Sequence, residues 1–155
     1  MNAELAPLTL RLATMADADQ LLAWRNDAGT RAASHQGDPV APDSHRRWLA
    51  AVLAQPGRQL WLAWRGDTAV GTVRADRGPA PQLGMVETTL SWTVSPDHRG
   101  GGIGRAIVVL AVQACAGPLH AEVRQGNTAS VRIAQAVGLK FAGELNGTLH
   151  FRSHD

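Results

Sequence analysis

A run of four glycines among the five residues 100–104 lies immediately before an apolar stretch with helical periodicity. Such a run between a strand and a helix exposes backbone N–H groups at the helix N-terminus, where the helix dipole favours negative charge. The missing Cβ atoms let a bulky anion come close, so we expect the loop to bind a phosphate group. An ordinary glycine-rich turn is the alternative. Arg99 and Arg105 flank the run and could contact that phosphate or lie in solvent.

The spacing of the glycines separates three known kinds of phosphate-binding loop. A Walker loop ends in Gly-Lys-Ser/Thr, but Gly104 is followed by arginine and alanine. A dinucleotide-binding fingerprint needs a third glycine three positions after the second, and here the two possible counts end on Arg105 or Ile107. The pattern that remains is Arg/Gln-x-x-Gly-x-Gly/Ala over residues 99–104.

A polar face is predicted on the strand that precedes the glycines. Because side chains alternate between the two faces of a strand, one face would carry Glu87, Thr89, Ser91 and Thr93. Such a face could hold an amine and a chain of waters, with Glu87 accepting a proton. Glu87 could instead lie at the exposed start of the strand. Weaker candidates for the proton acceptor are Asp76, His35 and His45.

The elements that must position these residues alternate between strands and helices. Alternating apolar residues predict strands over residues 8–12, 85–94 and 119–125. Helical periodicity, with a capping box at residues 14–17, predicts helices over 16–27, 44–54, 128–138 and from Ile103 onward. Asp43 is expected to be the N-cap of the second helix. Turn signals predict hairpins over 59–76 and 139–153, so we expect one α/β (α+β) domain over residues 1–155 with a mixed sheet.

Composition weighs against several classes of protein. The formal net charge is +2 without a basic tract, so we expect no nucleic-acid partner. No apolar run approaches the roughly 20 residues that span a bilayer, and no leader pattern is evident, so we expect a cytoplasmic protein with no membrane partner. Cys115 is the only cysteine and is expected in the core. The six histidines lack the spacing of a zinc site, so no metal is expected.

The segment Arg99-Gly100-Gly101-Gly102-Ile103-Gly104 resembles the acyl-coenzyme A pyrophosphate loop of the GNAT acetyltransferase superfamily. The resemblance continues in register through a strand ending "WTVSP" and through "AEVRQGNTASVRIAQAVGLKFAGEL", with Leu139 where phenylalanine is common. It covers most of the chain. The shorter words "WRND", "SHRRWL", "VGTVRAD" and "LSWTVSP" resemble the branch that N-acetylates amino-sugar nucleotides, including pseudaminic-acid pathway enzymes.

The resemblance implies a GNAT fold, with a mixed, mostly antiparallel sheet of about 6–7 strands, about 4 flanking helices and splayed central strands. Acetyl-CoA would be the co-substrate, with its pantetheine arm between the strands near residues 87–94 and 119–123. A backbone N–H there would polarise the thioester carbonyl. Asn127 would lie near the pantetheine or cap the helix that follows. The implied cofactor-binding residues are Thr93, Val94, Arg99, Gly100, Gly101, Gly102, Ile103, Gly104, Arg105 and Asn127.

The reaction implied by the resemblance is direct attack of a primary amine on the thioester. Many members of the superfamily place a tyrosine seven residues after the asparagine to protonate the leaving sulfur, but Ala134 stands there and the chain has no tyrosine. A thiolate can leave at modest cost, so an acid is useful rather than obligatory. Ser130 could supply that proton directly or through water.

On the acceptor side, Trp24 and Trp48 could stack on a sugar or base, or could pack in the core. Arg25, Arg31 and His45 could contact a nucleotide diphosphate or brace the helices.

The expected function is N-acetylation of a small amino-sugar nucleotide. The alternatives are a protein or peptide N-acetyltransferase and a non-catalytic acyl-CoA-binding domain. Open strand edges make a homodimer reasonable.

Overall fold

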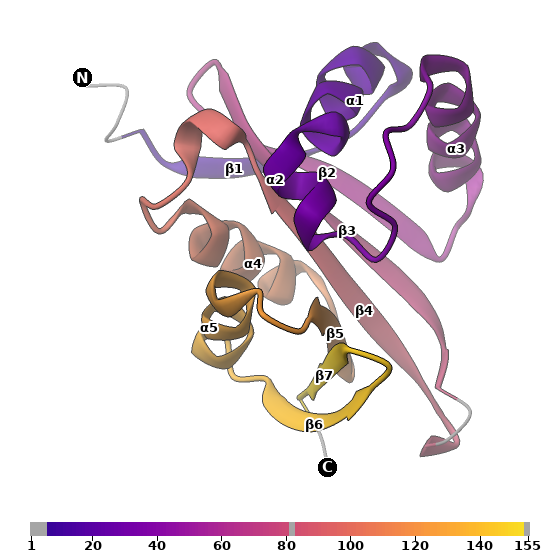
Figure 1. Ribbon diagram of the computed structural model, residues 1–155, viewed down its shortest axis with the longest axis vertical. Coiled ribbons are helices and arrows are strands. Elements are labelled where there is room, and N and C mark those ends of the chain that lie inside the picture. The colour runs from indigo at the N-terminus through magenta and orange to yellow at the C-terminus, as the bar shows by residue number, and fades with distance from the viewer. Residues whose placement is uncertain (1–5, 81–82, 154–155) are drawn as a thin grey trace.

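A seven-stranded, mostly antiparallel sheet forms the centre of this computed structural model, which describes residues 6–80 and 83–153 (Figure 1). The strand order is β1-β2-β3-β4-β5-β7-β6, and β4 and β5 are the parallel pair among the described strands. The strands are β1 Leu8–Leu12, β2 Arg58–Arg65, β3 Thr68–Ala80, β4 Met85–Val94, β5 Leu119–Arg124, β6 Lys140–Leu145 and β7 Thr148–Arg152. The number and arrangement of the strands confirm the expected fold.

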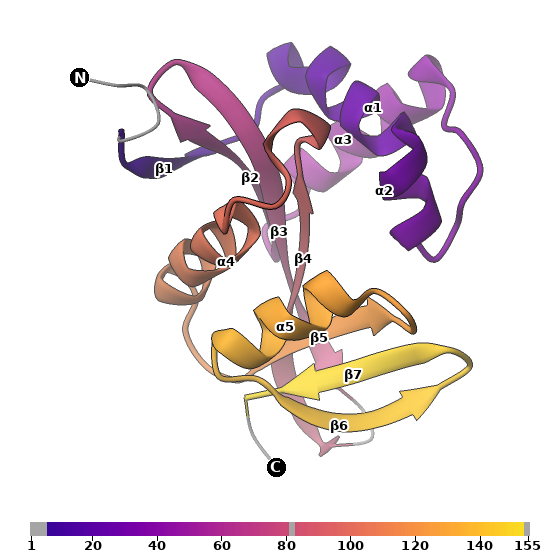
Figure 2. The ribbon, with the colours of Figure 1, turned by 60° about the vertical axis from the view of Figure 1, so that its left-hand side comes forward.

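Helices cover both faces of the sheet. Within the described residues they are α1 Ala18–Asn26, α2 Ala28–Ala33, α3 Pro42–Ala54, α4 Ile103–Ala114 and α5 Thr128–Ala136. Figure 2 shows α1, α2 and α3 on one side of the sheet and α4 on the other, where α5 packs against α4 and β5. Among the residues that the structure describes, no helix is long and apolar enough to cross a bilayer.

Strand β2 divides the apolar side chains between the two faces. Leu60 and Leu62 pack with α1 and α3 around Leu49, whereas Trp61 and Ala63 pack with α4 around Ile107. This alternation follows from the period of two in a strand. A third cluster around Phe151 lies between the β5-β7-β6 part of the sheet and α5.

The first helices differ from the prediction at their ends. The capping box at Thr14 and Asp17 is confirmed, but it opens a short 3-10 turn that leads into α1. The predicted helix over 16–27 ends at Asn26, because Asp27 leaves the helical conformation and accepts a hydrogen bond from Thr30 N at 3.0 Å. Asp27 therefore starts α2, a short helix that the sequence did not indicate.

The prediction of Asp43 as an N-cap was wrong. Helix α3 begins at Pro42 with Ala41 as its N-cap, and Asp43 lies in the first turn. Proline suits the first helical position because the N–H that it lacks would have no partner there. An acidic residue in the first turn still interacts favourably with the helix dipole.

Strands β4 and β5 separate soon after they pair. Their ladder covers Thr88–Leu90 and Leu119–Ala121, and the strands diverge beyond it. This is the expected splay of the central strands. The closing hairpin is also confirmed: Asn146 and Gly147 have φ of 51° and 80°, the positive values that a two-residue type I′ turn requires.

Substitution of Gly71 by alanine should destabilise the fold, because a Cβ at this position of β3 would lie 2.6 Å from the carbonyl oxygen of Thr93 and 2.7 Å from Ile107 Cδ1. We expect the free energy of unfolding in urea to fall by about 1–3 kcal/mol. Gly78 lies on the same strand with no atom within 4 Å of an added Cβ, so Gly78→Ala is the matched control. Equal stability of the two variants would contradict the prediction.

Candidate functional site

A large cleft opens where β4 and β5 diverge, with a volume of about 1410 Å³. Its floor is the second half of β4, residues 89–94, which includes Thr89, Ser91 and Thr93 of the predicted polar face. The antiparallel register places Asp76 opposite Thr89 and Arg74 opposite Ser91, so β3 extends the polar surface. The walls come from α1, α2 and α3 on one side and from the glycine run and α5 on the other.

The glycine run forms one rim of the cleft. Gly100 and Gly102 have φ of 84° and 78°, which non-glycine residues rarely adopt, and Gly102 is the N-cap of α4. Nothing lies within 4 Å of a Cβ added at Gly100, Gly101 or Gly102, so space remains in front of the loop. The loop therefore has the shape and the backbone donors of an anion site at a helix N-terminus.

Gly104 has a different role from the glycines before it. A Cβ at this position would lie 2.7 Å from Ile133 Cδ1 and 3.2 Å from Val94 Cγ2. Its lack of a side chain lets the first turn of α4 pack closely against β4 and α5.

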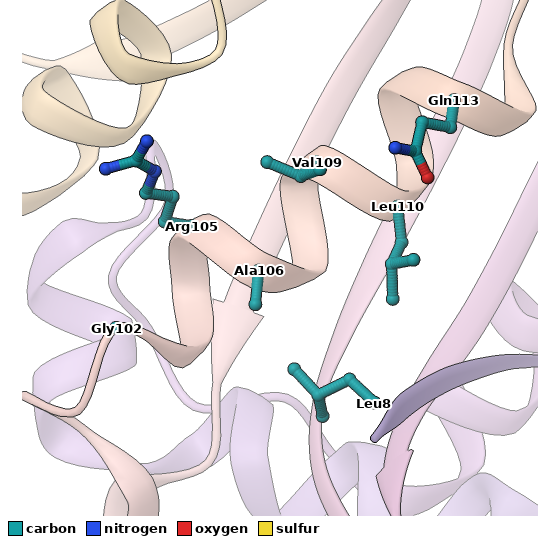
Figure 3. A pocket seen from close by; sticks show the side chains of 7 residues that line it. All are labelled: Leu8, Gly102, Arg105, Ala106, Val109, Leu110 and Gln113. Atoms are coloured by element: carbon teal, nitrogen blue, oxygen red, sulfur yellow. The ribbon is translucent and has the colours of Figure 1, made fainter.

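The two arginines beside the loop have different surroundings. Arg99 Nη2 donates to Asp27 Oδ2 at 2.8 Å and to Thr30 Oγ1 at 2.9 Å, which ties the loop to α2. The hydrogen bond from Arg99 holds the pKa of the Asp27 carboxyl below its usual value. Arg105 lies in the first turn of α4 and points away from Leu8 of β1 (Figure 3). It lines the cleft and has no ion-pair partner among the described residues, so its charge is available to a ligand.

The gap between β4 and β5 brings together the other predicted cofactor residues and the predicted proton donor Ser130. Thr93 and Val94 line it from β4, and Asn127 and Ser130 line it from the start of α5. Asn127 Oδ1 accepts a hydrogen bond from Ser130 N at 3.2 Å, so Asn127 caps α5. Its side-chain amide can still donate, so the cap and a ligand contact are compatible.

Glu87 lies apart from the residues that line the cleft. Its carboxylate accepts hydrogen bonds from Arg152 Nε at 3.2 Å and Nη2 at 3.4 Å, and its Oε1 is 3.5 Å from His120 Nδ1. Only 7% of the residue is exposed, so the alternative of an exposed strand start was wrong. Burial also lowers the pKa of His120, against the opposing charge of Glu87. Because Glu87 is enclosed by these partners, direct contact with an acceptor in the cleft is not favoured.

Two carboxylates line the cleft, Asp76 and Glu122. Asp76 is paired with Arg58 at 2.9 Å and with Arg74 at 2.8 Å. Glu122, whose side chain is 43% exposed, makes a weaker ion pair with His35 Nε2 at 3.7 Å and has no arginine partner among the described residues. It is the first β5 residue beyond the ladder with β4, so it stands at the point where the strands separate. Glu122 was not among the residues predicted from the sequence, although alternation along β5 could have placed it on the polar face.

A model of the acetyltransferase (GNAT) domain family matches residues 7–140 of the chain. The chain belongs to the GNAT acetyltransferase family. It is therefore an acyltransferase, and the co-substrate of this family is acetyl-CoA. The alternative of a non-catalytic acyl-CoA-binding domain is therefore set aside.

Solved structures agree with this membership, whereas no curated protein matches the chain. The ribosomal-protein-alanine N-acetyltransferase of Brucella melitensis is 26% identical, with a TM-score of 0.75 over 93% of this chain and 98% of that one. A candidate acetyltransferase from Salmonella typhimurium, solved with acetyl-CoA, is 21% identical, with a TM-score of 0.72 over 95% and 92%. AAC(6')-Ib, solved with paromomycin and acetyl-CoA, is 17% identical, with a TM-score of 0.78 over 94% and 92%.

The predicted acceptor residues of this acetyltransferase have different surroundings. Trp24 and His45 line the cleft but are 5% and 4% exposed, so both are mainly packed. Trp48 is 38% exposed, and the Arg74 guanidinium lies 5.7 Å from the centre of its ring. Arg31 does not line the cleft: its Nε donates to the carbonyl of Asn26, which braces the chain after α1.

Burial and neighbouring charges shift the pKa of two side chains in the acetyltransferase, His45 and Cys115. Burial lowers the pKa of His45, and the charges of Arg25 and Arg46 lower it further. Arg25 Nη2 donates to the carbonyl of Gln36 at 2.7 Å and also lines the cleft. Cys115 is half-buried between two core clusters, and burial raises the pKa of its thiol, so it is not a reactive thiolate.

Proposed function

We propose that this acetyltransferase transfers the acetyl group of acetyl-CoA directly to the primary amine of a small, negatively charged acceptor, an amino-sugar nucleotide being the favoured class. The observation that carries this proposal is the charge of the cleft, which six arginines and two carboxylates line. A cleft of one predominant sign attracts ligands of the opposite sign. Coenzyme A is one such ligand, and the arginines away from its loop favour a second anionic group.

The position of those arginines supports an anionic acceptor. Arg99, Arg105 and Arg132 lie near the glycine run and α5, where the cofactor phosphates would bind. Arg25 and Arg74 line the cleft from α1 and β3, and Arg74 lies over the exposed indole of Trp48. An indole beside guanidinium groups suits a ligand that combines a ring with phosphate groups.

Glu122 is the proton acceptor in this proposal, in place of Glu87. It lines the cleft where the two strands separate, and it is not held by an arginine as Asp76 is. The amine must lose a proton as it attacks the thioester, and a positioned carboxylate can take that proton directly or through water. The backbone at Thr93 and Val94 would polarise the thioester carbonyl. Ser130 would donate a proton to the leaving sulfur.

A second candidate function is acetylation of a protein N-terminus. It is supported by the 26% identity to the ribosomal-protein-alanine N-acetyltransferase, the highest identity among the three structures described above. The two functions share the cofactor loop and the proton acceptor, and they differ in what the arginines on α1 and β3 contact.

An acceptor panel tests the proposal and separates the two candidates. The purified protein would be incubated with acetyl-CoA and one of four amines: a nucleotide-linked 4-amino sugar, the same sugar without the nucleotide, an alanine-terminated peptide, or the cationic aminoglycoside paromomycin. Mass spectrometry would detect the acetylated product. We expect the nucleotide-linked sugar to be acetylated with the highest kcat/KM, and the free sugar at least about tenfold less well, because it lacks the charged group. Faster acetylation of the peptide or of paromomycin would overturn the assigned acceptor class.

A further inference from the structure

Two histidines and a glutamate gather on one face of β5 and β7, and the glutamate also lines the cleft. One ligand atom from each of His120, Glu122 and His150 lies within 4.8 Å of the others. His120 and Glu122 alternate onto the same face of β5, and the antiparallel register places His150 of β7 opposite Glu122. The nearest pair is His120 Nε2 and His150 Nδ1, which are 2.9 Å apart.

The other ring nitrogen of His120 is already held in place. His120 Nδ1 lies 2.9 Å from Thr89 Oγ1 and 3.5 Å from Glu87 Oε1. Arg152 binds the Glu87 carboxylate through two nitrogens. A histidine that binds a metal generally donates its other N–H to a carboxylate or a similar acceptor, which fixes the tautomer. A proton on Nδ1 of His120 leaves the lone pair of Nε2 directed at His150.

We propose that His120, Glu122 and His150 form a binding site for a divalent transition-metal ion of the zinc type. Two imidazoles and one carboxylate are a donor set that Zn²⁺ takes with one position left open. Metal–nitrogen bonds of about 2.0–2.1 Å in a tetrahedral site put the two nitrogens about 3.3 Å apart. The nitrogens would therefore move apart by a few tenths of an ångström, and the nearly parallel rings would turn so that both lone pairs point at the ion. The proton on Nδ1 of His150 moves to its own Nε2, so the site takes the ion without a net loss of protons.

The coordination can be completed from the cleft side. His35 also lines the cleft, and its Nε2 lies 3.7 Å from Glu122 Oε2. Either this imidazole or a water would fill the fourth position. The buried His120, only 4% exposed, anchors the inner side of the site, and the exposed carboxylate closes its outer side.

The site has a consequence for transfer that rests on the proposed function. Glu122 cannot accept a proton from the amine while its carboxylate binds a cation. The ion is therefore an inhibitor of the transferase and takes no part in the reaction.

Calorimetric titration of ZnCl₂ into the metal-free full-length protein, without acetyl-CoA or acceptor, tests the site itself. We expect one ion to bind per chain, and we expect His150→Gln and Glu122→Gln each to weaken binding by at least about tenfold. His98→Gln removes a histidine outside the cluster and should bind like the wild type. Absence of binding to the wild type, or wild-type affinity in both cluster variants, would overturn the proposal.

Two further measurements identify the ligands and the consequence for activity. Co²⁺ in place of Zn²⁺ should give the visible absorption of a four-coordinate ion in the wild type and lose it in His150→Gln. Zn²⁺ should inhibit acetylation by the wild type and should inhibit His150→Gln at least about tenfold less strongly. Product mass is the suitable readout, because the thiol of released coenzyme A itself binds zinc. The titration contains no substrate, so its result stands whether or not the proposed acceptor is correct.

Discussion

Replacement of Glu122 by glutamine is expected to lower kcat by about 10²–10⁴-fold, the range that general base catalysis supplies. Glutamine has the size and polarity of the carboxylate but cannot accept the proton that the attacking amine must lose. The side chain is exposed at the edge of the cleft and is not held by an arginine, so the fold should be unaffected. Steady-state kinetics with the best acceptor of the panel, together with calorimetry of acetyl-CoA binding, would measure the effect.

Two variants make this result specific to Glu122. Glu144 is an exposed glutamate of β6 that does not line the cleft, so Glu144→Gln should retain wild-type kcat and serves as the matched control. Glu87→Gln tests Glu87, the proton acceptor that the sequence favoured. If folded Glu87→Gln loses activity while Glu122→Gln keeps it, the carboxylate beside Arg152 is the base and the assignment of Glu122 is refuted.

Substitution of Gly102 by glutamate is expected to weaken acetyl-CoA binding by about two orders of magnitude. The new carboxylate would lie at the N-terminus of α4, where the proposed pyrophosphate site is. Two like charges about 6 Å apart at an effective dielectric constant of about 20 repel each other by about 3 kcal/mol. Isothermal titration of acetyl-CoA into the folded variant measures the loss.

Backbone strain must be separated from charge in this experiment. Gly102 has a φ of 78°, so any side chain strains the loop, and Gly102→Gln introduces that strain with a side chain of the same size but no charge. We expect Gly102→Gln to bind at least about tenfold more tightly than Gly102→Glu. Gly104 is unsuitable for this purpose, because its substitution would first displace Ile133. Equal binding by the two Gly102 variants would show that charge at this position is unimportant, and that the anion binds elsewhere.

The local features of the fold could be predicted because they depend on residues that are close in the chain. A capping box at Thr14, a type I′ turn at Asn146 and a strand–glycine–helix connection each express a conformational preference within a few residues. The errors at α2 and α3 both concern where a helix begins. Asp27 caps α2, a helix that the periodicity did not indicate, whereas α3 was predicted and only its start was placed two residues too late, at Ser44 instead of Pro42.

That most of the predicted cofactor residues lie together in one cleft could likewise be inferred from the sequence. Residues 99–105 and the start of α5 are short segments whose positions follow from the elements that they join. Only the different roles of the glycines needed the structure, since the open space at Gly102 and the close packing at Gly104 depend on β4 and α5.

The sequence by itself determined the order of strands and helices apart from α2, the strand–glycine–helix connection that we predict to bind an anion, and the polar face of β4, because hydrophobic periodicity and glycine conformation act over a few residues. Only the tertiary structure decided that Glu87 is enclosed by Arg152, that Glu122 lies in the cleft, and that His120 meets His150. These contacts arise from the sheet order and the strand register, which place β7 between β5 and β6. Side chains separated by 30 or 65 residues then become neighbours, and no local spacing records that proximity.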